Sequence, residues 1–412
     1  MRDVVGPLRF IFTHGRFREL LGCMFLLGLV YSFVLPFFSM FGTREVGMSS
    51  WTFAVFMIAT SLAAVVASTV LARWSDTRYS RRSILILGCL GGALGYGVFA
   101  YVRDVPTLFF VGCFVLSVSS VTFSQLFAYA REMIMRSELR PSEAPLYLNV
   151  FRLTYALSWT AGPAIAAWTM MHHGFRGTFL AAAGLFLALL LLILHVVPAN
   201  APTAAAQAAA RVPLRQTLRR PDILVHFCGF VLLFAAGTMN MLNLPLLVLH
   251  SLGGGERDIG IIFSIAPAFE IPLMFYFGLL ASKGHQGSLI RAAAVIALVY
   301  YAGLASVQAP WQIYPLQVLS AALVSITSGV AISFFQDYLP EQPGTATNLF
   351  TNASRLGSMV GYVVFGALLD RLGHRGIFVI CSSLAAITAA LFFYRRVLEM
   401  RTARALRGAV GD

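Results

Sequence analysis

The second half of this 412-residue chain repeats its first half, and this repeat limits the possible folds most strongly. The segment YLNVFRL, which ends at Leu153, recurs as LFTNASRL, which ends at Leu356. The repeat places Arg152 and Arg355 at matching positions inside apolar stretches. Soluble repeat proteins have periods of about 20 to 50 residues, whereas this period is roughly four times longer or more. Since the repeated sequence is apolar, it predicts a duplicated membrane bundle, the architecture of many transporters.

Composition predicts the same class independently. The chain is 58% hydrophobic and 11% charged, with a mean hydropathy of +0.78, which is outside the range of soluble domains. A helix crosses a bilayer with about 20 apolar residues. We expect an all-α membrane protein of twelve transmembrane helices in two pseudo-symmetric six-helix bundles. The predicted spans are 19–42, 49–72, 83–102, 106–130, 147–171, 177–198, 223–250, 258–281, 289–308, 311–337, 347–370 and 375–395.

The domain boundaries follow from these spans. We expect an N-terminal bundle over 1–198, a cytoplasmic linker over 199–222, a C-terminal bundle over 223–396 and a cytoplasmic tail over 397–412. The linker is rich in alanine and proline, and we interpret it as a passive tether. The first span is too long for a cleavable signal peptide and lacks a small-residue cleavage site.

The basic residues predict the orientation in the membrane. With an inside amino terminus, 22 of the 30 basic residues fall on the cytoplasmic side and six on the other, and Arg152 and Arg355 lie within spans. The positive-inside rule therefore places both termini in the cytoplasm, and we expect a multi-pass protein of the bacterial inner membrane. This bias also accounts for the net charge of +13, so we expect no nucleic-acid partner.

No cofactor or enzymatic chemistry is indicated by the sequence. All five cysteines lie within predicted spans, without disulfide or metal spacing, and we interpret them as packing residues. The sequence contains no nucleotide-binding loop of the GxxxxGK[ST] type, hydrolytic triad or metal cluster. We therefore expect a protein that is not an enzyme, is not driven by ATP, binds no metal and acts as a monomer.

The loop after the second span carries a specific motif. In LARWSDTRYSRR, Asp76 follows a small residue by four positions, and Arg78 and Arg81 come next. The pattern resembles the signature loop of the major facilitator superfamily, in which an acid follows a glycine by four. An arginine of this loop can reach Glu132, next to Arg131 at the cytoplasmic end of span four. The resemblance implies a conformational latch, although such charges also occur as plain topology signals.

Several segments narrow the resemblance further. Thr43–Gly47 (TREVG), Gln125–Glu132 (QLFAYARE), Phe269–Pro272 (FEIP), Phe335–Pro340 (FQDYLP) and Thr345–Asn352 (TATNLFTN) look like the bacterial sugar efflux transporter family within that superfamily. They run in the same order as in that family, from span one to span eleven. The resemblance implies the major facilitator fold and the export of sugars or glycosides, with protons moving inward in exchange.

Placing an ionisable residue inside a membrane span costs free energy, so such residues are candidate functional residues. Glu270 is the one acid near the centre of a span. Because desolvation penalises the charged form, its carboxyl is a candidate for proton coupling; it could also accept a sugar hydroxyl, pair with an arginine, or be structural. Arg152 and Arg355 are predicted to line the cytoplasmic side of a cavity, or to extend to the lipid headgroups.

Amides and aromatic rings within the spans are candidate substrate ligands. Asn and Gln both donate and accept hydrogen bonds, as sugar hydroxyls require, and Tyr31 could stack on a sugar ring. Polar residues within spans also serve as helix-packing surfaces, so this alternative stays open for each. The predicted substrate-binding residues are Tyr31, Gln125, Asn240, Asn243, Glu270, Gln336 and Asn352.

Three functions remain open on the sequence. The first is a proton-coupled sugar exporter, and the number of amides and serines within the spans favours it. The second is a multidrug exporter of the same fold, favoured by 13% aromatic residues and 14 methionines, which suit adaptable apolar pockets. The third is a receptor or assembly protein that has kept the fold without transporting, which would have no need of a latch.

Overall fold

The computed structural model describes residues 15–136, 144–198, 220–339 and 343–411. Within them every regular element is helical, which confirms the predicted all-α class. The chain divides into two compact units: Met1–Gln207 with Gly255–Pro267, and Ala208–Gly254 with Ala268–Asp412. The boundaries predicted at 198 and 223 stay a prediction.

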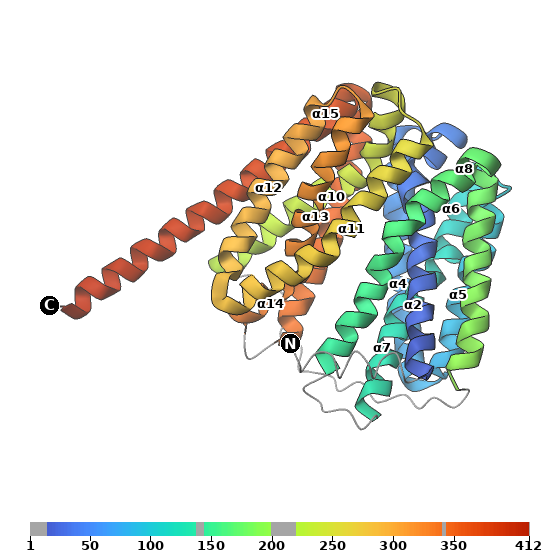
Figure 1. The fold of residues 1–412 in the computed structure, drawn as a ribbon, viewed down its shortest axis with the longest axis horizontal. Helices are drawn as coiled ribbons and strands as arrows, with labels where there is room; N and C mark the ends of the chain where they lie inside the picture. Colours follow the sequence, from blue (N-terminus) through green and yellow to red (C-terminus); the bar gives the residue numbers. More distant parts are fainter. Residues whose placement is uncertain (1–14, 137–143, 199–219, 340–342, 412) are drawn as a thin grey trace. The chain divides into compact units, whose positions relative to one another are not determined.

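The helices of the first half, drawn in Figure 1, have bounds close to those of the predicted spans. They begin and end at Gly15–Val34 (α2), Ser50–Thr77 (α4), Arg81–Phe99 (α5), Val105–Phe114 (α6), Val121–Arg136 (α7) and Ala144–Val196 (α8). Three short helical turns, Leu35–Phe37, Phe38–Met40 (α3) and Phe41–Glu45, extend α2, and a further turn, Leu116–Ser120, joins α6 to α7.

The helices of the second half follow the same plan. They are Pro221–Ser251 (α10), Glu256–Leu280 (α11), Gln286–Ser306 (α12), Ile313–Gly329 (α13), Ala331–Tyr338 (α14) and Pro343–Gly411 (α15). The turn Ala281–His285 joins α11 to α12, and Pro310–Gln312 precedes α13. In Figure 1 the last part of α15 extends away from the other helices of its unit.

Nine helical segments in the described residues are long and apolar enough to cross a membrane. Three of them, 47, 51 and 54 residues long, greatly exceed the roughly 20 residues of one crossing. Each of these three is broken by a glycine at positive φ: Gly174 (61°), Gly284 (84°) and Gly373 (66°). A residue with a Cβ rarely adopts this conformation, so the glycines allow the chain to turn back. The three breaks lie in three of the gaps between the predicted spans, and the count of twelve spans stays a prediction.

Small residues determine how closely the helices approach in the first unit. Gly28 of α2 packs against the main-chain oxygen of Tyr155 and the hydroxyl of Ser158 in α8, while Gly162 of α8 packs against Ser32 of α2. A Cβ on Gly28 would lie 2.8 Å from the Tyr155 oxygen. Such small-residue contacts let membrane helices pack backbone to backbone, so α2 and α8 interlock at two points.

The second unit repeats this arrangement with α10 and α15. A Cβ on Gly357 would lie 2.6 Å from the main-chain oxygen of Val231, and a Cβ on Gly361 would lie 2.7 Å from that of Ala235. The hydroxyl of Thr238 also donates to Ser358 at 3.1 Å. The duplication is therefore visible in the packing of the first and fifth helices of each half, and it fixes the backbone on which the polar side chains stand.

Candidate functional site

A buried ion pair links α5 to α7 in the first unit. Ser80 caps the start of α5 by accepting a hydrogen bond from the Ser83 N–H, which leaves Arg81 as the first helical residue. Arg81 Nη2 lies 2.5 Å from Glu132 Oε1, with the two side chains 4% and 13% exposed. The contact expected between this loop and Glu132 is therefore present. Removing one partner of a charge pair buried at this depth destabilises the folded protein by about 3–5 kcal/mol.

Gln125 belongs to the same network. Its Oε1 accepts a hydrogen bond from Arg81 Nη1 at 2.6 Å and another from the Ser75 hydroxyl at 3.0 Å. The side chain is buried, and its two acceptor positions are engaged by α4 and α5. These contacts tie together the ends of α4, α5 and α7, and they compete with the sugar contact that the sequence predicts for Gln125.

The other residues of the predicted latch lie elsewhere. Arg78 ends α4 and is exposed, and Arg131 on α7 is also exposed. The side chain of Asp76 lies outside the described residues. Of the five residues predicted for the latch, the structure therefore brings Arg81 and Glu132 together in the buried network.

Aromatic side chains gather on the facing parts of α2, α7 and α8. The ring centroids of Tyr31 and Tyr155 are 6.5 Å apart, and those of Phe123 and Tyr155 are 5.2 Å apart in an edge-to-face arrangement. We call Tyr31, Phe123 and Tyr155 the aromatic cluster. Phe123 and Tyr155 were not predicted from the sequence; the position of Tyr155, three residues after Arg152 on the same helix, is a signal that could have found Tyr155.

The second unit carries a chain of polar groups instead. Gln317 Nε2 on α13 donates to the Tyr300 hydroxyl on α12 at 3.4 Å, and that hydroxyl donates to Asn240 Oδ1 on α10 at 3.4 Å. Tyr300 and Gln317 are buried, whereas Asn240 is half-buried. The sequence predicted Asn240 but missed the two residues behind it.

Asn243 lies one turn further along α10 but has a different environment. Its Nδ2 donates to the main-chain oxygen of His374 at 2.8 Å, and its Oδ1 accepts from His374 Nδ1 at 2.9 Å. Asn243 is fully buried, and the His374 ring stacks on His250 with centroids 5.4 Å apart. Asn243 thereby fastens α10 to the turn at Gly373, which competes with the predicted role in sugar binding.

Three further predicted ligands lie on α11, α14 and α15. Glu270 is half-buried, and its main-chain oxygen accepts a hydrogen bond from the Ser325 hydroxyl of α13 at 3.1 Å. Gln336 Nε2 donates to the Thr347 hydroxyl at 3.4 Å, which links α14 to α15. Asn352 is half-buried on α15.

The duplicated arginines differ in exposure. Arg152 is half-buried on α8, while Arg355 is exposed on α15. Matching positions in the sequence therefore do not give the two guanidinium groups the same environment within their units, and the predicted role of both in a cavity stays a prediction.

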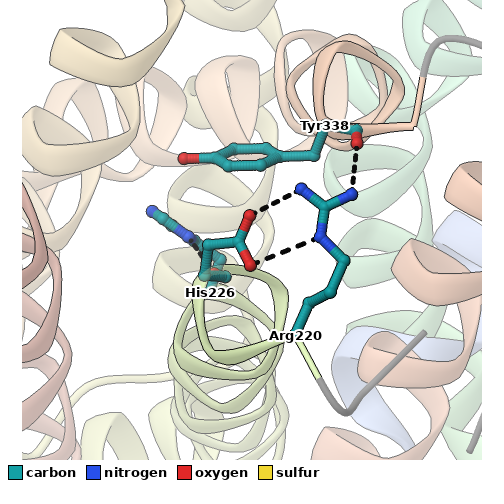
Figure 2. A network of polar contacts seen from close by, with 4 residues as sticks. Arg220, His226 and Tyr338 are labelled. Atoms are coloured by element: carbon teal, nitrogen blue, oxygen red, sulfur yellow. Dashed lines mark hydrogen bonds and ion pairs between the residues drawn. The ribbon is translucent and has the colours of Figure 1, made fainter. Parts of the chain in front are cut away.

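A second ion pair stands at the start of α10 (Figure 2). Arg220 Nη2 lies 2.7 Å from Asp222 Oδ2, and Arg220 Nη1 donates to the main-chain oxygen of Tyr338 at the end of α14, at 3.2 Å. His226 Nδ1 donates to the Asp222 main-chain oxygen at 2.7 Å, and its ring contacts those of Phe334, Tyr338 and Phe392. The network ties α10 to α14, and the sequence did not predict it.

The sequence of this chain matches a known protein family and named relatives. The profile described as Major Facilitator Superfamily matches residues 20–362 and, in a second match, 227–411. The chain is 31% identical over 362 residues to sugar efflux transporter A of Dickeya chrysanthemi, covering 88% of this chain and 91% of the relative. It is 28% identical over 379 residues to sugar efflux transporter A of Escherichia coli, covering 91% and 94%.

Solved structures share the fold at low sequence identity. The crystal structure of the nucleoside transporter NupG superposes with a TM-score of 0.73 at 14% identity, covering 92% of this chain and 99% of the transporter. A POT family transporter superposes with a TM-score of 0.72 at 13% identity, covering 93% and 96%. The fold is thus one that membrane transporters use.

Proposed function

We propose, because the chain belongs to the Major Facilitator Superfamily, that it exports sugars or glycosides across the bacterial inner membrane in exchange for protons. The family and the fold make it a multi-pass membrane transporter and not an enzyme. The names of its relatives support sugars as the substrate class. Two of these relatives are named sugar efflux transporters, and the match covers about nine-tenths of both chains.

The observation that carries the sugar proposal is the polar chain from Gln317 through Tyr300 to Asn240. A half-buried amide held by two buried partners is expensive to place among apolar helices. A carrier of lipophilic compounds gains little from it, whereas a sugar needs donors and acceptors at fixed positions. The aromatic cluster of the first unit supplies apolar faces of the kind that stack on sugar rings.

We assign proton coupling to Glu270. It lies near the middle of α11, which is an apolar helix, and the Ser325 hydrogen bond fixes its main chain. An ionisable group inside an apolar helix is costly and commonly serves in proton transfer, so in this proposal the carboxyl takes up a proton from one side and releases it to the other when its surroundings change. Inward movement of that proton would drive sugar outward by alternating access.

The Arg81–Glu132–Gln125 network serves in this proposal as the latch. Such a network biases the balance between the two conformations without touching the substrate, so it acts on turnover rather than on binding. We place its end of the helices, together with both termini, in the cytoplasm, where the basic residues concentrate, and we propose that the protein acts as a monomer.

A multidrug exporter is the second candidate. The aromatic cluster and the 14 methionines favour it, because soft apolar walls adapt to many lipophilic shapes. The two candidates differ in the role of Asn240: a sugar carrier needs the hydrogen bonds between Asn240 and its substrate, and a drug carrier does not.

Transport by the purified protein in proteoliposomes tests the proposal. An acidic lumen should drive proton exit and accumulation of labelled glucose, galactose, lactose or a methyl glycoside, and a protonophore should abolish the accumulation. Labelled tetraphenylphosphonium and ethidium, under the same gradient, test the drug exporter. Accumulation of the cations without any sugar would overturn the sugar proposal, and sugar accumulation that ignores the pH gradient would overturn the coupling.

A further inference from the structure

We propose that Tyr300 and Gln317 are positioning residues that fix Asn240 as a hydrogen-bond donor to the substrate, so that the transporter recognises one sugar hydroxyl as an acceptor. The inference rests on the proposed sugar function and adds to it a rule of specificity. It starts from the direction of the hydrogen bonds in the chain Gln317–Tyr300–Asn240.

The direction is set by Gln317. Its Nε2 carries hydrogens and no lone pair for accepting, so it must donate to the Tyr300 oxygen. The Tyr300 phenol has a single O–H, which it donates to Asn240 Oδ1. The carbonyl of the Asn240 amide is therefore turned towards Tyr300, and its NH₂ group is turned the other way.

Burial distinguishes the two ends of this chain. Tyr300 is 1% exposed and Gln317 is 3% exposed, whereas Asn240 is half-buried. Asn240 is therefore the accessible end of a series of hydrogen bonds that begins at buried residues of the second unit. Because an amide can otherwise present either its oxygen or its nitrogen, the two buried residues decide which of these faces a ligand.

The consequence concerns the sugar. An NH₂ group donates to the oxygen of a hydroxyl and does not need the hydroxyl proton. Replacing that hydroxyl by fluorine keeps a weak acceptor, whereas replacing it by hydrogen removes the acceptor. At one position of the sugar ring, the deoxyfluoro analogue should therefore bind better than the deoxy analogue.

The structure offers a matched pair of variants to test this. Tyr300 and Tyr301 are neighbours on α12 and each is 1% exposed, but the chain to Asn240 runs through the Tyr300 hydroxyl. Tyr300→Phe removes that hydroxyl, and Tyr301→Phe makes the same change beside it. Gln317→Met, which removes the donor behind Tyr300, provides a second variant if Tyr300→Phe folds poorly.

Equilibrium binding to purified protein is the measurement. The probes are methyl β-D-glucopyranoside and methyl β-D-galactopyranoside with their monodeoxy and monodeoxyfluoro analogues. In the wild type, one deoxy analogue should lose about tenfold in affinity relative to its deoxyfluoro counterpart, the range of one hydrogen bond. In Tyr300→Phe and Gln317→Met that preference should disappear, because the amide can turn over, while Tyr301→Phe should retain it.

The outcomes separate this inference from the proposed function. If the wild type binds none of these sugars, both the proposed function and the inference fall. If it binds them but Tyr300→Phe and Gln317→Met keep the preference for fluorine over hydrogen, the inference falls alone. A lower melting temperature in these variants with the preference intact would mean that Tyr300 and Gln317 only pack the helices, and it would likewise overturn the inference.

Discussion

The interiors of the two units differ in chemistry although their helices pack alike. Around Tyr31 in the first unit, the clustered side chains are the aromatic rings of Tyr31, Phe123 and Tyr155. Around Asn240 in the second unit, they are the amides and hydroxyl of Asn240, Tyr300 and Gln317, and Glu270 on α11 is linked to α13 through Ser325. The interlocked small residues are common to both units. The two halves therefore share their helix contacts, while the side chains at these two places offer apolar contact in the first unit and hydrogen bonding in the second.

The largest effect is expected at Glu270. Glu270→Gln keeps the size and the hydrogen-bonding capacity of the side chain but removes the titrating proton. Accumulation of sugar driven by an acidic lumen should be abolished, since no group then couples proton movement to the conformational change. The measurement is uptake of labelled sugar into proteoliposomes, with equilibrium binding of the same sugar to show that the protein is folded.

Glu256→Gln is the control for this change. Glu256 lies in the first turn of the same helix, α11, at the end of the span rather than its middle. Its replacement should leave the proton-driven accumulation close to the wild-type level. Accumulation at the native rate in Glu270→Gln would show that the coupling group lies elsewhere, and loss in both variants would point to a general requirement for negative charge on α11.

The second effect concerns the amides of α10. Asn240→Ala leaves a sugar hydroxyl without its partner, which costs about 1–3 kcal/mol, or roughly fivefold to a hundredfold in affinity. A lipophilic cation should lose much less, because packing holds it. Titration of one variant with both ligand classes therefore distinguishes the sugar carrier from the drug carrier.

Asn243→Ala, one turn away, is the matched control. Its loss removes the partner of His374 Nδ1 and of the His374 main-chain oxygen, so the expected result is a lower melting temperature with sugar affinity retained. If Asn243→Ala weakens sugar binding as much as Asn240→Ala, then both amides contact the sugar, as the sequence predicts. Unchanged sugar binding in Asn240→Ala would instead favour the drug exporter over the sugar exporter.

The sequence predicted well where the helices lie, because hydropathy is a local signal; the glycines at the three breaks carried a local signal that did not enter these predictions. It also predicted that an arginine of the loop contacts Glu132, because the loop resembles a family motif, but it did not single out Arg81 as that arginine. It missed Tyr300 and Gln317, whose importance depends on Asn240, 60 and 77 positions earlier in the chain. It could not show that Asn240 and Asn243 have different partners, because three-residue spacing places both on one helix face and the partners come from other helices.

A smaller effect is expected at the aromatic cluster. Tyr31→Leu removes a ring that pairs with Tyr155 and can stack on a sugar, and a contact of this kind contributes about 0.5–1.5 kcal/mol. Sugar affinity should fall by roughly twofold to twelvefold at that energy. Tyr31→Phe keeps the ring and removes only the hydroxyl, so it should bind sugar nearly as well as the wild type. Equal losses in both variants would show that the hydroxyl, and not the ring, contacts the sugar.

The smallest effect on sugar affinity is expected at the two ion-pair networks, which lie on helix ends. Arg81–Glu132 is buried, while Arg220 is 50% exposed and Asp222 is 15% exposed. Exposed pairs contribute about 0–1 kcal/mol, so Asp222→Asn should change turnover by severalfold at most. Glu132→Gln removes a charge from a buried network and should slow turnover more, since each 1.4 kcal/mol in the balance between conformations changes it about tenfold.

Neither variant should alter the dissociation constant of the sugar, because the networks bias the two conformations and make no contact with the substrate. Initial rates of sugar exchange and equilibrium binding, measured on the same preparations, separate the two effects. A slower rate in Glu132→Gln with unchanged affinity supports a latch confined to the first unit. Equal slowing in Asp222→Asn would mean that both halves carry a latch, and the asymmetry between the units would then be limited to their interiors.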